Sequence, residues 1–280
     1  MRVQYLDAAK AIGIVLMVIG HCILTMHKYP HFQGFIYTFH MPLFFLISGM
    51  LVKRDFDTNP IRKYASAYLC PYLITCVVLL SVVGMMQMMG YIPHDGVRSC
   101  LLAAIYVNGA IDDSIILGDF YSIGPLWFLF ALFWAQTIYF YINKYSSGLN
   151  RLIYVFGVFS LGWLSSLYIR LPLSTQAGMC ALLFLEIGYH IKRHDVIEKI
   201  NGISPLALLC LCLIYLIGWT KGDLSMAKAQ YTLPLFCIMG SVIATVLLLA
   251  LLKKAKVGGV LLEETPFLYF AQTKYWVTSR

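Results

Sequence analysis

Long runs of apolar residues, each bounded by charged or turn-forming residues, dominate the pattern along the chain. A helix rises about 1.5 Å per residue, so crossing a hydrocarbon core of about 30 Å takes roughly 20 apolar residues. The runs that approach this length cover residues 8–26, 35–52, 64–89, 124–142, 152–169, 173–191, 203–219 and 231–252. The pattern therefore predicts an all-α fold, a polytopic transmembrane helical bundle with about eight to ten spans.

Two segments do not fit this pattern. Residues 101–106 are too short to span and lead into an acidic stretch at 112–119, so we expect an extramembrane or re-entrant segment there. The aromatic tail from Pro266 ends at Arg280, which leaves space for a truncated last helix at most, and we expect it to lie at the membrane interface. No internal repeat is visible, so we predict one domain over residues 1–280.

Composition excludes two classes of protein. Hydrophobic residues make up 60% of the chain and charged residues only 12%, whereas a soluble domain is about half apolar and a quarter charged. A soluble enzyme is therefore excluded, and so is a disordered chain, which would be poor in apolar residues. The net charge of +8 comes from short basic clusters between apolar runs, which indicates membrane topology and argues against nucleic-acid binding.

The distribution of Lys and Arg predicts the orientation. If the spans alternate in direction, most of these residues fall on the side that holds the N-terminus. The opposite side then holds Lys28, Arg98, Arg170, Lys221 and Lys228. Because cytoplasmic loops carry the excess of basic residues, the N-terminus is predicted to be cytoplasmic.

The first predicted helix carries Asp7, Lys10 and His21, and ionisable residues inside a membrane usually mark function. Lys10 and His21 are separated by about three helical turns and so share a face, on which Asp7 also lies. This polar stripe has simpler interpretations as well. Lys10 could extend its amine to the inner headgroups, and Asp7 could be a helix N-terminal charge.

Two further ionisable residues fall inside predicted spans. His40 lies about 12 Å below the outer surface and His21 about 20 Å above the inner one, so the two imidazoles could share a site. Alternatively, His40 only bonds a neighbouring helix. For Glu186 we favour an ion pair with Lys192 or Arg193 near the inner end of its own helix.

Two segments carry a family resemblance. YLDAAK at residues 5–10 leads to Gly20-His21, and Lys10 and His21 fit a basic residue, ten intervening residues and a histidine. The second segment is FHMPLFFLISG at 39–49. Both resemble the first two helices of the integral-membrane acyltransferase 3 family, with the fucose 4-O-acetylase-like acetyltransferases as the nearest branch.

The resemblance implies acyl transfer from a coenzyme A thioester, usually acetyl-CoA, to a hydroxyl of a cell-envelope glycan or lipid-linked sugar. It implies a multi-pass protein of the bacterial cytoplasmic membrane, in contact with lipid, without a metal or permanently bound cofactor. The residues that it assigns are His21 as base, His40 to orient His21 or polarise the thioester carbonyl, Lys10, Arg62 and Lys63 to bind donor phosphates, and Asp7, Ser48 and Glu186 in support.

Other interpretations remain open. A transporter could use His21, Lys10 and Glu186 as a proton or substrate path, although the sequence has no visible inverted repeat. A non-catalytic scaffold would make the polar stripe incidental. Under acyl transfer, the donor is cytoplasmic while His21 is predicted in the outer half. Either the donor's pantetheine arm reaches along the stripe, or acyl groups are relayed across.

Overall fold

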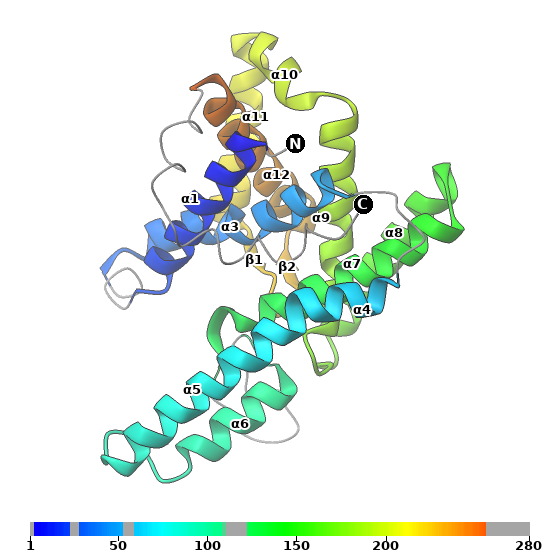
Figure 1. Ribbon diagram of the computed structural model, residues 1–280. Helices are drawn as coiled ribbons and strands as arrows, with labels where there is room; N and C mark the ends of the chain where they lie inside the picture. The colour runs from blue at the N-terminus through cyan, green and yellow to red at the C-terminus, as the bar shows by residue number, and fades with distance from the viewer. Residues whose placement is uncertain (1–2, 23–27, 53–58, 108, 110–121, 256–280) are drawn as a thin grey trace.

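The computed structural model describes residues 3–22, 28–52, 59–107, 109 and 122–255 (Figure 1). Its elements are α1 (Gln4–Gly20), α3 (Pro30–Met50), α4 (Pro60–Tyr64), the π-helical turn η1 (Ala65–Leu69), α5 (Cys70–Met88), α6 (Gly96–Tyr106), the 3₁₀ turn η2 (Gly124–Leu126), α7 (Trp127–Tyr145), α8 (Gly148–Ser166), α9 (Thr175–Arg193), α10 (Val196–Lys199), the 3₁₀ turn η3 (Ile200–Gly202), α11 (Pro205–Lys221), β1 (Asp223–Ser225), β2 (Gln230–Thr232) and α12 (Pro234–Lys254).

Within the described residues, each apolar run that the sequence singles out contains most or all of a helix. By length and hydropathy, three continuous helical segments among the described residues are able to cross a membrane: Pro60–Met88, Gly124–Tyr145 and Pro234–Lys254. The membrane-helix prediction is thus supported for these segments, while the total of eight to ten spans and the cytoplasmic N-terminus stay predictions. Residues 112–119 and the tail from Pro266 lie outside the described residues.

A short β-hairpin joins α11 to α12. The all-α prediction did not include these two strands. Strands β1 and β2 pair antiparallel, with Ser225 opposite Gln230 and Leu224 opposite Tyr231. Each strand has only three residues, and Tyr231 is buried against the ring of Phe159. The hairpin therefore packs against the helices.

Helices α3 and α9 cross at the centre of the bundle with their backbones in close approach. A Cβ added at Gly49 would lie 2.0 Å from the carbonyl oxygen of Leu185, and one added at Gly188 would lie 2.1 Å from that of Leu46. Glycine is therefore required at both positions. Small residues at such a crossing permit the close packing of membrane helices.

Replacing Gly188 with alanine is expected to destabilise the protein by about 1–3 kcal/mol or more, because neither backbone can yield without moving a helix. Gly157 on α8 is the matched control, since a Cβ there has no heavy atom within 4 Å. Gly157→Ala should leave stability unchanged or raise it by up to about 1 kcal/mol through helix propensity. Thermal unfolding in one detergent compares the variants, and an equal midpoint for both would contradict the crossing.

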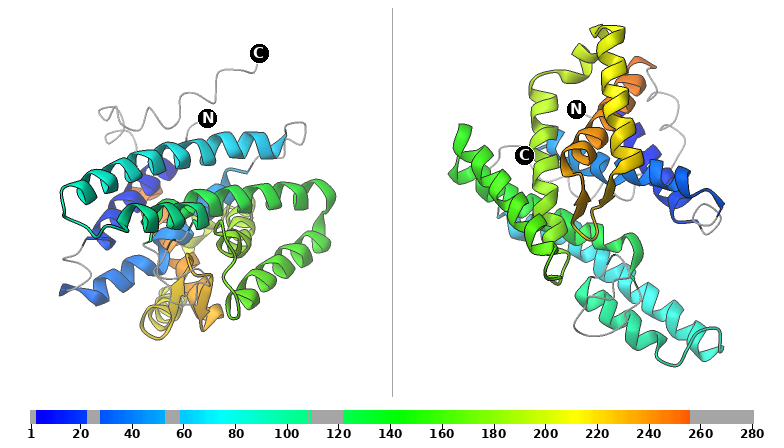
Figure 2. Two further views of the ribbon diagram at one scale, coloured as in Figure 1. Left: turned by 90° about the horizontal axis from the view of Figure 1, so that it is seen from below. Right: turned by 180° about the vertical axis from the view of Figure 1, so that it is seen from behind.

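Helices α5 and α6 form an antiparallel pair that projects from the remaining helices (Figures 1 and 2). Only 11% of the most apolar window of Pro60–Met88 is buried inside the protein. Its large exposed apolar side chains include Leu73, Ile74, Val77, Val78, Met85 and Met86. Such a surface is stable when lipid covers it, which is consistent with a membrane location.

The bundle has two ends, which position the site. We call distal the end where α1 and α11 finish and α3 and α12 begin, with the β-hairpin beside them. The opposite, proximal end holds the start of α1 and the end of α12. There Lys253 pairs with Glu198 and lies over the ring of Tyr5.

Candidate functional site

Two histidines and a tyrosine come together at the distal end. His21 follows the last residue of α1, and His40 lies three residues, nearly one turn, after Tyr37 in α3. The ring centroids of His21 and His40 are 6.4 Å apart, and Tyr37 lies 5.4 Å from His21 and 5.1 Å from His40. His40 is 4% exposed, whereas His21 is exposed. The structure thus brings together the two histidines that the sequence singles out.

Side chains of α3 fix the end of α1. The carbonyl oxygen of Gly20 accepts hydrogen bonds from Gln33 Nε2 and Tyr37 Oη, both 3.2 Å away. The last carbonyls of a helix lack partners within the helix, so these two bonds satisfy one of them. A Cβ on Gly20 would lie 2.9 Å from the Tyr37 ring, so glycine permits this contact. His21 is therefore held beside His40 by the residue that precedes it.

The hydrogen bonds of both imidazoles leave the same ring nitrogen available. His21 Nδ1 is 2.8 Å from the carbonyl oxygen of Met17, and His40 Nδ1 is 2.9 Å from that of Ile36. A carbonyl oxygen only accepts, so Nδ1 of each neutral ring carries the hydrogen. Nε2 then keeps its lone pair, which is the form that a general base requires.

The histidines line a cavity of about 650 Å³ at the distal end, within the usual range of about 300–1,000 Å³ for small-molecule sites. Its wall comes from the residue after α1, from α3, from η2 and the start of α7, from the end of α11 and from the β-hairpin. Besides His21, Tyr37 and His40, it includes Gln33, Thr38, Ser122, Trp127, Trp219, Asp223, Ser225, Lys228 and Gln230. Hydrogen-bonding groups and aromatic rings thus face the same partly open space.

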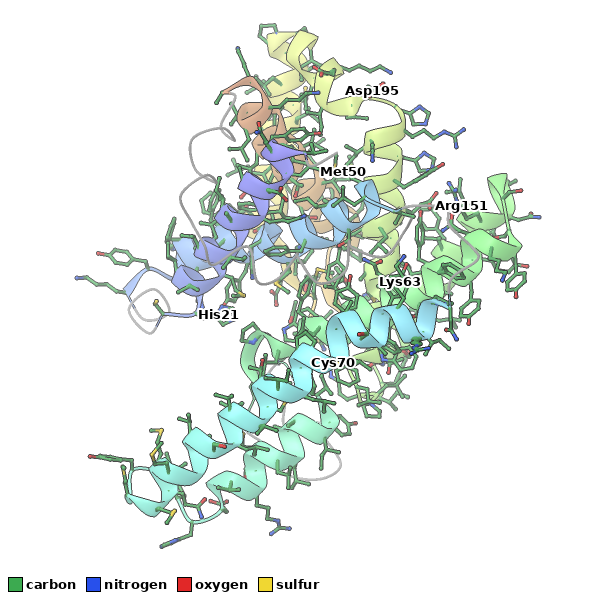
Figure 3. All side chains as sticks on the ribbon, in the orientation of Figure 1. His21, Met50, Lys63, Cys70, Arg151 and Asp195 are labelled. Carbon is green, nitrogen blue, oxygen red and sulfur yellow. The ribbon has the colours of Figure 1, made fainter. Side chains whose placement is uncertain are left out.

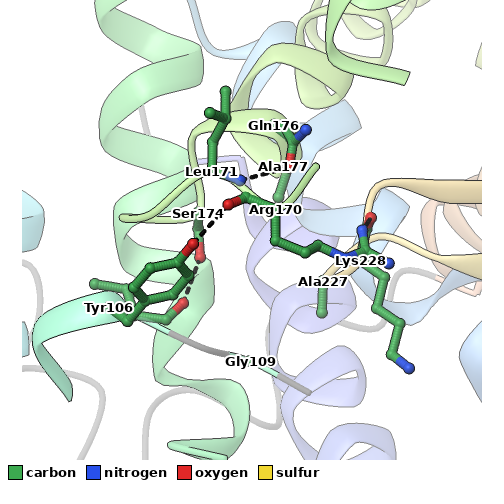
Figure 4. A pocket seen from close by; sticks show the side chains of 10 residues that line it. Tyr106, Gly109, Arg170, Leu171, Ser174, Gln176, Ala177, Ala227 and Lys228 are labelled. Atoms are coloured by element: carbon green, nitrogen blue, oxygen red, sulfur yellow. Dashed lines mark hydrogen bonds between the residues drawn. The ribbon is translucent and has the colours of Figure 1, made fainter. Parts of the chain in front are cut away.

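The turn of the β-hairpin is anchored to α8 and the residues that follow it. Ser166 Oγ donates to the carbonyl oxygen of Ala229 over 2.8 Å, and the Arg170 guanidinium donates to the carbonyl oxygen of Lys228. Tyr106 Oη in turn donates to the carbonyl oxygen of Arg170 (Figure 4). The residues of the last two bonds, Tyr106, Arg170 and Lys228, line a pocket of about 30 Å³, space for roughly one water molecule. The hairpin residues that line the 650 Å³ cavity are therefore held in place by Ser166 and Arg170.

The predicted donor-binding residues lie apart from the histidines. Lys10 pairs with Asp7 across 3.4 Å, about 16 Å along α1 from His21. Arg62 and Lys63 are exposed on α4, and Figure 3 shows Lys63 well separated from His21. Ser48 lies beside the α3–α9 crossing. None of these side chains lines the 650 Å³ cavity.

The preferred partner of Glu186 was wrong. Arg151 of α8, rather than Lys192 or Arg193, pairs with this carboxylate, with 2.6 Å between Arg151 Nη2 and Glu186 Oε1. Tyr139 Oη donates to the other carboxylate oxygen over 2.6 Å, and His190 Nε2 lies 2.9 Å from Oε1. Three helices therefore meet at one buried charge pair, away from the histidine cavity.

Sequence reasoning missed Gln33, Tyr37 and the hairpin residues. A signal existed for the first two, because residues 33, 37 and 40 follow helical spacing and share one face of α3. The hairpin had no comparable sequence signal, because its strands have only three residues each. Within the described part of the chain, no group of three or more His, Cys, Asp or Glu residues is arranged to hold a metal ion.

Comparisons with known proteins place the chain in a family. Residues 3–277 match the family described as an acyltransferase domain, acyltransferase 3. The nodulation protein NolL of Mesorhizobium japonicum is similar, with 28% identity over 236 residues, 77% of this chain and 56% of that protein. The chain thus spans little more than half the length of that relative, and no solved structure matches it. The chain belongs to the acyltransferase 3 family.

Proposed function

We propose that the protein is a membrane O-acyltransferase of a bacterial cytoplasmic membrane. It moves an acetyl or other short acyl group from a coenzyme A thioester to a hydroxyl of a cell-envelope glycan or lipid-linked sugar. One observation carries this proposal: an exposed histidine with an available Nε2 lies beside a second histidine in a 650 Å³ cavity of an acyltransferase-family chain.

The chemistry assigned to His21 is general base catalysis. Its Nε2 takes the proton of the acceptor hydroxyl while the oxygen attacks the thioester carbonyl carbon. As the C–S bond breaks, the coenzyme A thiolate leaves and takes that proton back from the imidazolium, so that the products are an O-acyl ester and coenzyme A. The Met17 carbonyl oxygen, which accepts from Nδ1, stabilises the imidazolium in between.

His40 takes a supporting role in this scheme. Its Nδ1 hydrogen is bonded to the Ile36 carbonyl oxygen, so its Nε2 accepts and does not donate when the ring is neutral. This arrangement suits orienting the acceptor hydroxyl or His21 better than polarising the thioester carbonyl. Lys10, Arg62 and Lys63 remain proposed contacts for the phosphates of the donor, with Asp7, Ser48 and Glu186 in structural support.

The transporter alternative is less well supported. It needs a polar path through His21, Lys10 and Glu186. Lys10 is paired with Asp7, Glu186 is bonded to Arg151 and Tyr139, and neither lines the cavity that holds His21.

The test is coenzyme A release from acetyl-CoA by the purified protein in lipid nanodiscs, with and without an envelope glycan fraction. Acyl transfer predicts release that depends on the acceptor, together with saturable binding of labelled acetyl-CoA. The same protein in proteoliposomes, assayed for uptake of the glycan fraction, serves as comparison. Uptake without acetyl-CoA binding would contradict acyl transfer and favour the transporter.

A further inference from the structure

The β-hairpin lines the histidine cavity with polar residues, beside the apolar Leu224, Met226 and Ala227. Asp223, Ser225 and Gln230 line the cavity, and Ser225 pairs directly with Gln230 across the two strands. Alternate residues of a strand point to opposite faces, so Asp223 and Ser225 share one face, and Tyr231 lies on the other, against Phe159. A carboxylate, a hydroxyl and an amide are thus gathered beside the histidine cluster.

Aromatic surface completes this wall. Trp219, two residues before the end of α11, is half-buried and lines the cavity. Its ring packs against Phe35 with centroids 5.7 Å apart, and its Nε1 donates to the carbonyl oxygen of His31 over 3.3 Å. A fixed ring beside hydrogen-bonding groups offers a flat apolar face and polar partners together, which matches the alternating C–H and O–H surfaces of a sugar ring.

The charge of the lining narrows the ligand class. Among the residues that the structure describes, the lining includes one carboxylate, Asp223, and one ammonium group, Lys228, besides the two histidines. Recognition of an anionic group usually relies on Arg or on several charge-assisted donors. Arg170, the nearby guanidinium, is bonded to the Lys228 carbonyl oxygen behind the hairpin and is not among the cavity-lining residues. An acidic sugar would therefore lose water and meet a single ammonium group, Lys228, whose charge is opposed by the Asp223 carboxylate.

We propose that the β-hairpin and Trp219 form the acceptor subsite and that this subsite selects an uncharged sugar ring over an acidic one. Ser225 and Gln230 bind ring hydroxyls, Trp219 packs on the ring face, and the anchors at Ser166 and Arg170 keep the wall at a fixed position relative to His21. The inference rests on the proposed function, of which it specifies the acceptor side.

Binding without turnover tests this subsite. The probes are p-nitrophenyl β-glycosides of glucose, galactose and N-acetylglucosamine, whose nitrophenyl group quenches tryptophan fluorescence, and the matching glucuronide. Trp219 and Trp127 both line the cavity and are the fluorescent reporters. Reversal of the quench by excess methyl glycoside separates binding at the site from partition into lipid.

We expect saturable, reversible quenching by at least one neutral glycoside and at least about tenfold weaker binding of the glucuronide. Combining Ser225→Ala with Gln230→Ala should weaken the neutral glycoside at least about tenfold, because two hydrogen bonds are lost. Thr232→Ala is the matched control: it is on the same hairpin, exposed and outside the cavity lining, and should bind as the wild type does.

Three results would overturn the subsite: no reversible quench with any neutral glycoside, equal binding of the glucuronide, or unchanged binding in the double variant. The coenzyme A release assay is separate. Normal glycoside binding without acetyl-CoA-dependent release would remove the proposed acyl transfer and keep the sugar site. Acceptor-dependent release that is unchanged in the Ser225→Ala, Gln230→Ala double variant would keep the proposed acyl transfer and remove the sugar site.

Discussion

Replacing His21 with alanine should lower acceptor-dependent coenzyme A release by about 10²–10⁴-fold, which is the usual contribution of a positioned general base. The side chain lies beyond the end of α1 and is exposed, so its removal leaves no core cavity. Binding of acetyl-CoA and the unfolding midpoint should therefore stay close to those of the wild type. Single-turnover rates at saturating donor measure the effect on the chemical step.

His31→Ala is the matched control for this prediction. His31 is an exposed histidine on the first turn of α3, near the same end of the bundle, and does not line the cavity. Its hydrogen bond with the cavity residue Trp219 uses the backbone carbonyl, which alanine keeps. Loss of the side chain should therefore change the rate less than about threefold, as expected for a surface substitution. A His21→Ala protein that keeps more than about a tenth of the wild-type rate would remove His21 from the role of base.

Replacing Arg151 with methionine should cost about 3–5 kcal/mol of stability, because it leaves the Glu186 carboxylate buried without its cation. The two side chains are only 5% and 4% exposed, so water cannot replace the lost partner. Tyr139 and His190 remain beside the carboxylate, which places the expected cost toward the lower end of that range. Unfolding in a single detergent at fixed lipid content measures the loss.

Two further variants distinguish the cost of an unpaired buried charge from the cost of lost side-chain packing. Adding Glu186→Gln to Arg151→Met removes the unpaired charge and keeps an oxygen that can accept from Tyr139, so at least half of the lost stability should return. Lys253→Met breaks the pair with Glu198, where the partners are 36% and 57% exposed, and should cost less than about 1 kcal/mol. If Arg151→Met and Lys253→Met lost the same free energy of unfolding, burial would not explain the cost of breaking the Arg151–Glu186 pair.

The sequence was sufficient for the helices because each must be apolar over most of its length. Runs such as 173–191 and 231–252 match α9 and α12 to within a few residues. It was also sufficient to place His21 and His40 at one level, since helical rise and antiparallel order fix their depth. The distance between the two rings and the hydrogen bonds that each ring makes could not be predicted, because they depend on how α1 packs on α3.

The sequence was not sufficient where partners come from other helices. Lys192 and Arg193 were the nearest cations to Glu186 along the chain, whereas Arg151 reaches it from α8, thirty-five residues earlier. The sequence also failed to predict the hairpin, for a related reason. Strands of three residues carry almost no periodicity, and Ser166 and Arg170, which anchor the hairpin, lie about sixty residues before it.

The double role of α3 has a consequence for how activity would be lost on heating. Its first half carries Gln33, Tyr37 and His40, and its second half crosses α9 at Gly49. The residues that shape the site and those that join the bundle's centre therefore belong to one rigid element. Inactivation and collapse of the bundle should then occur as a single cooperative event, whereas the sparsely packed α5–α6 pair opens at a lower free energy.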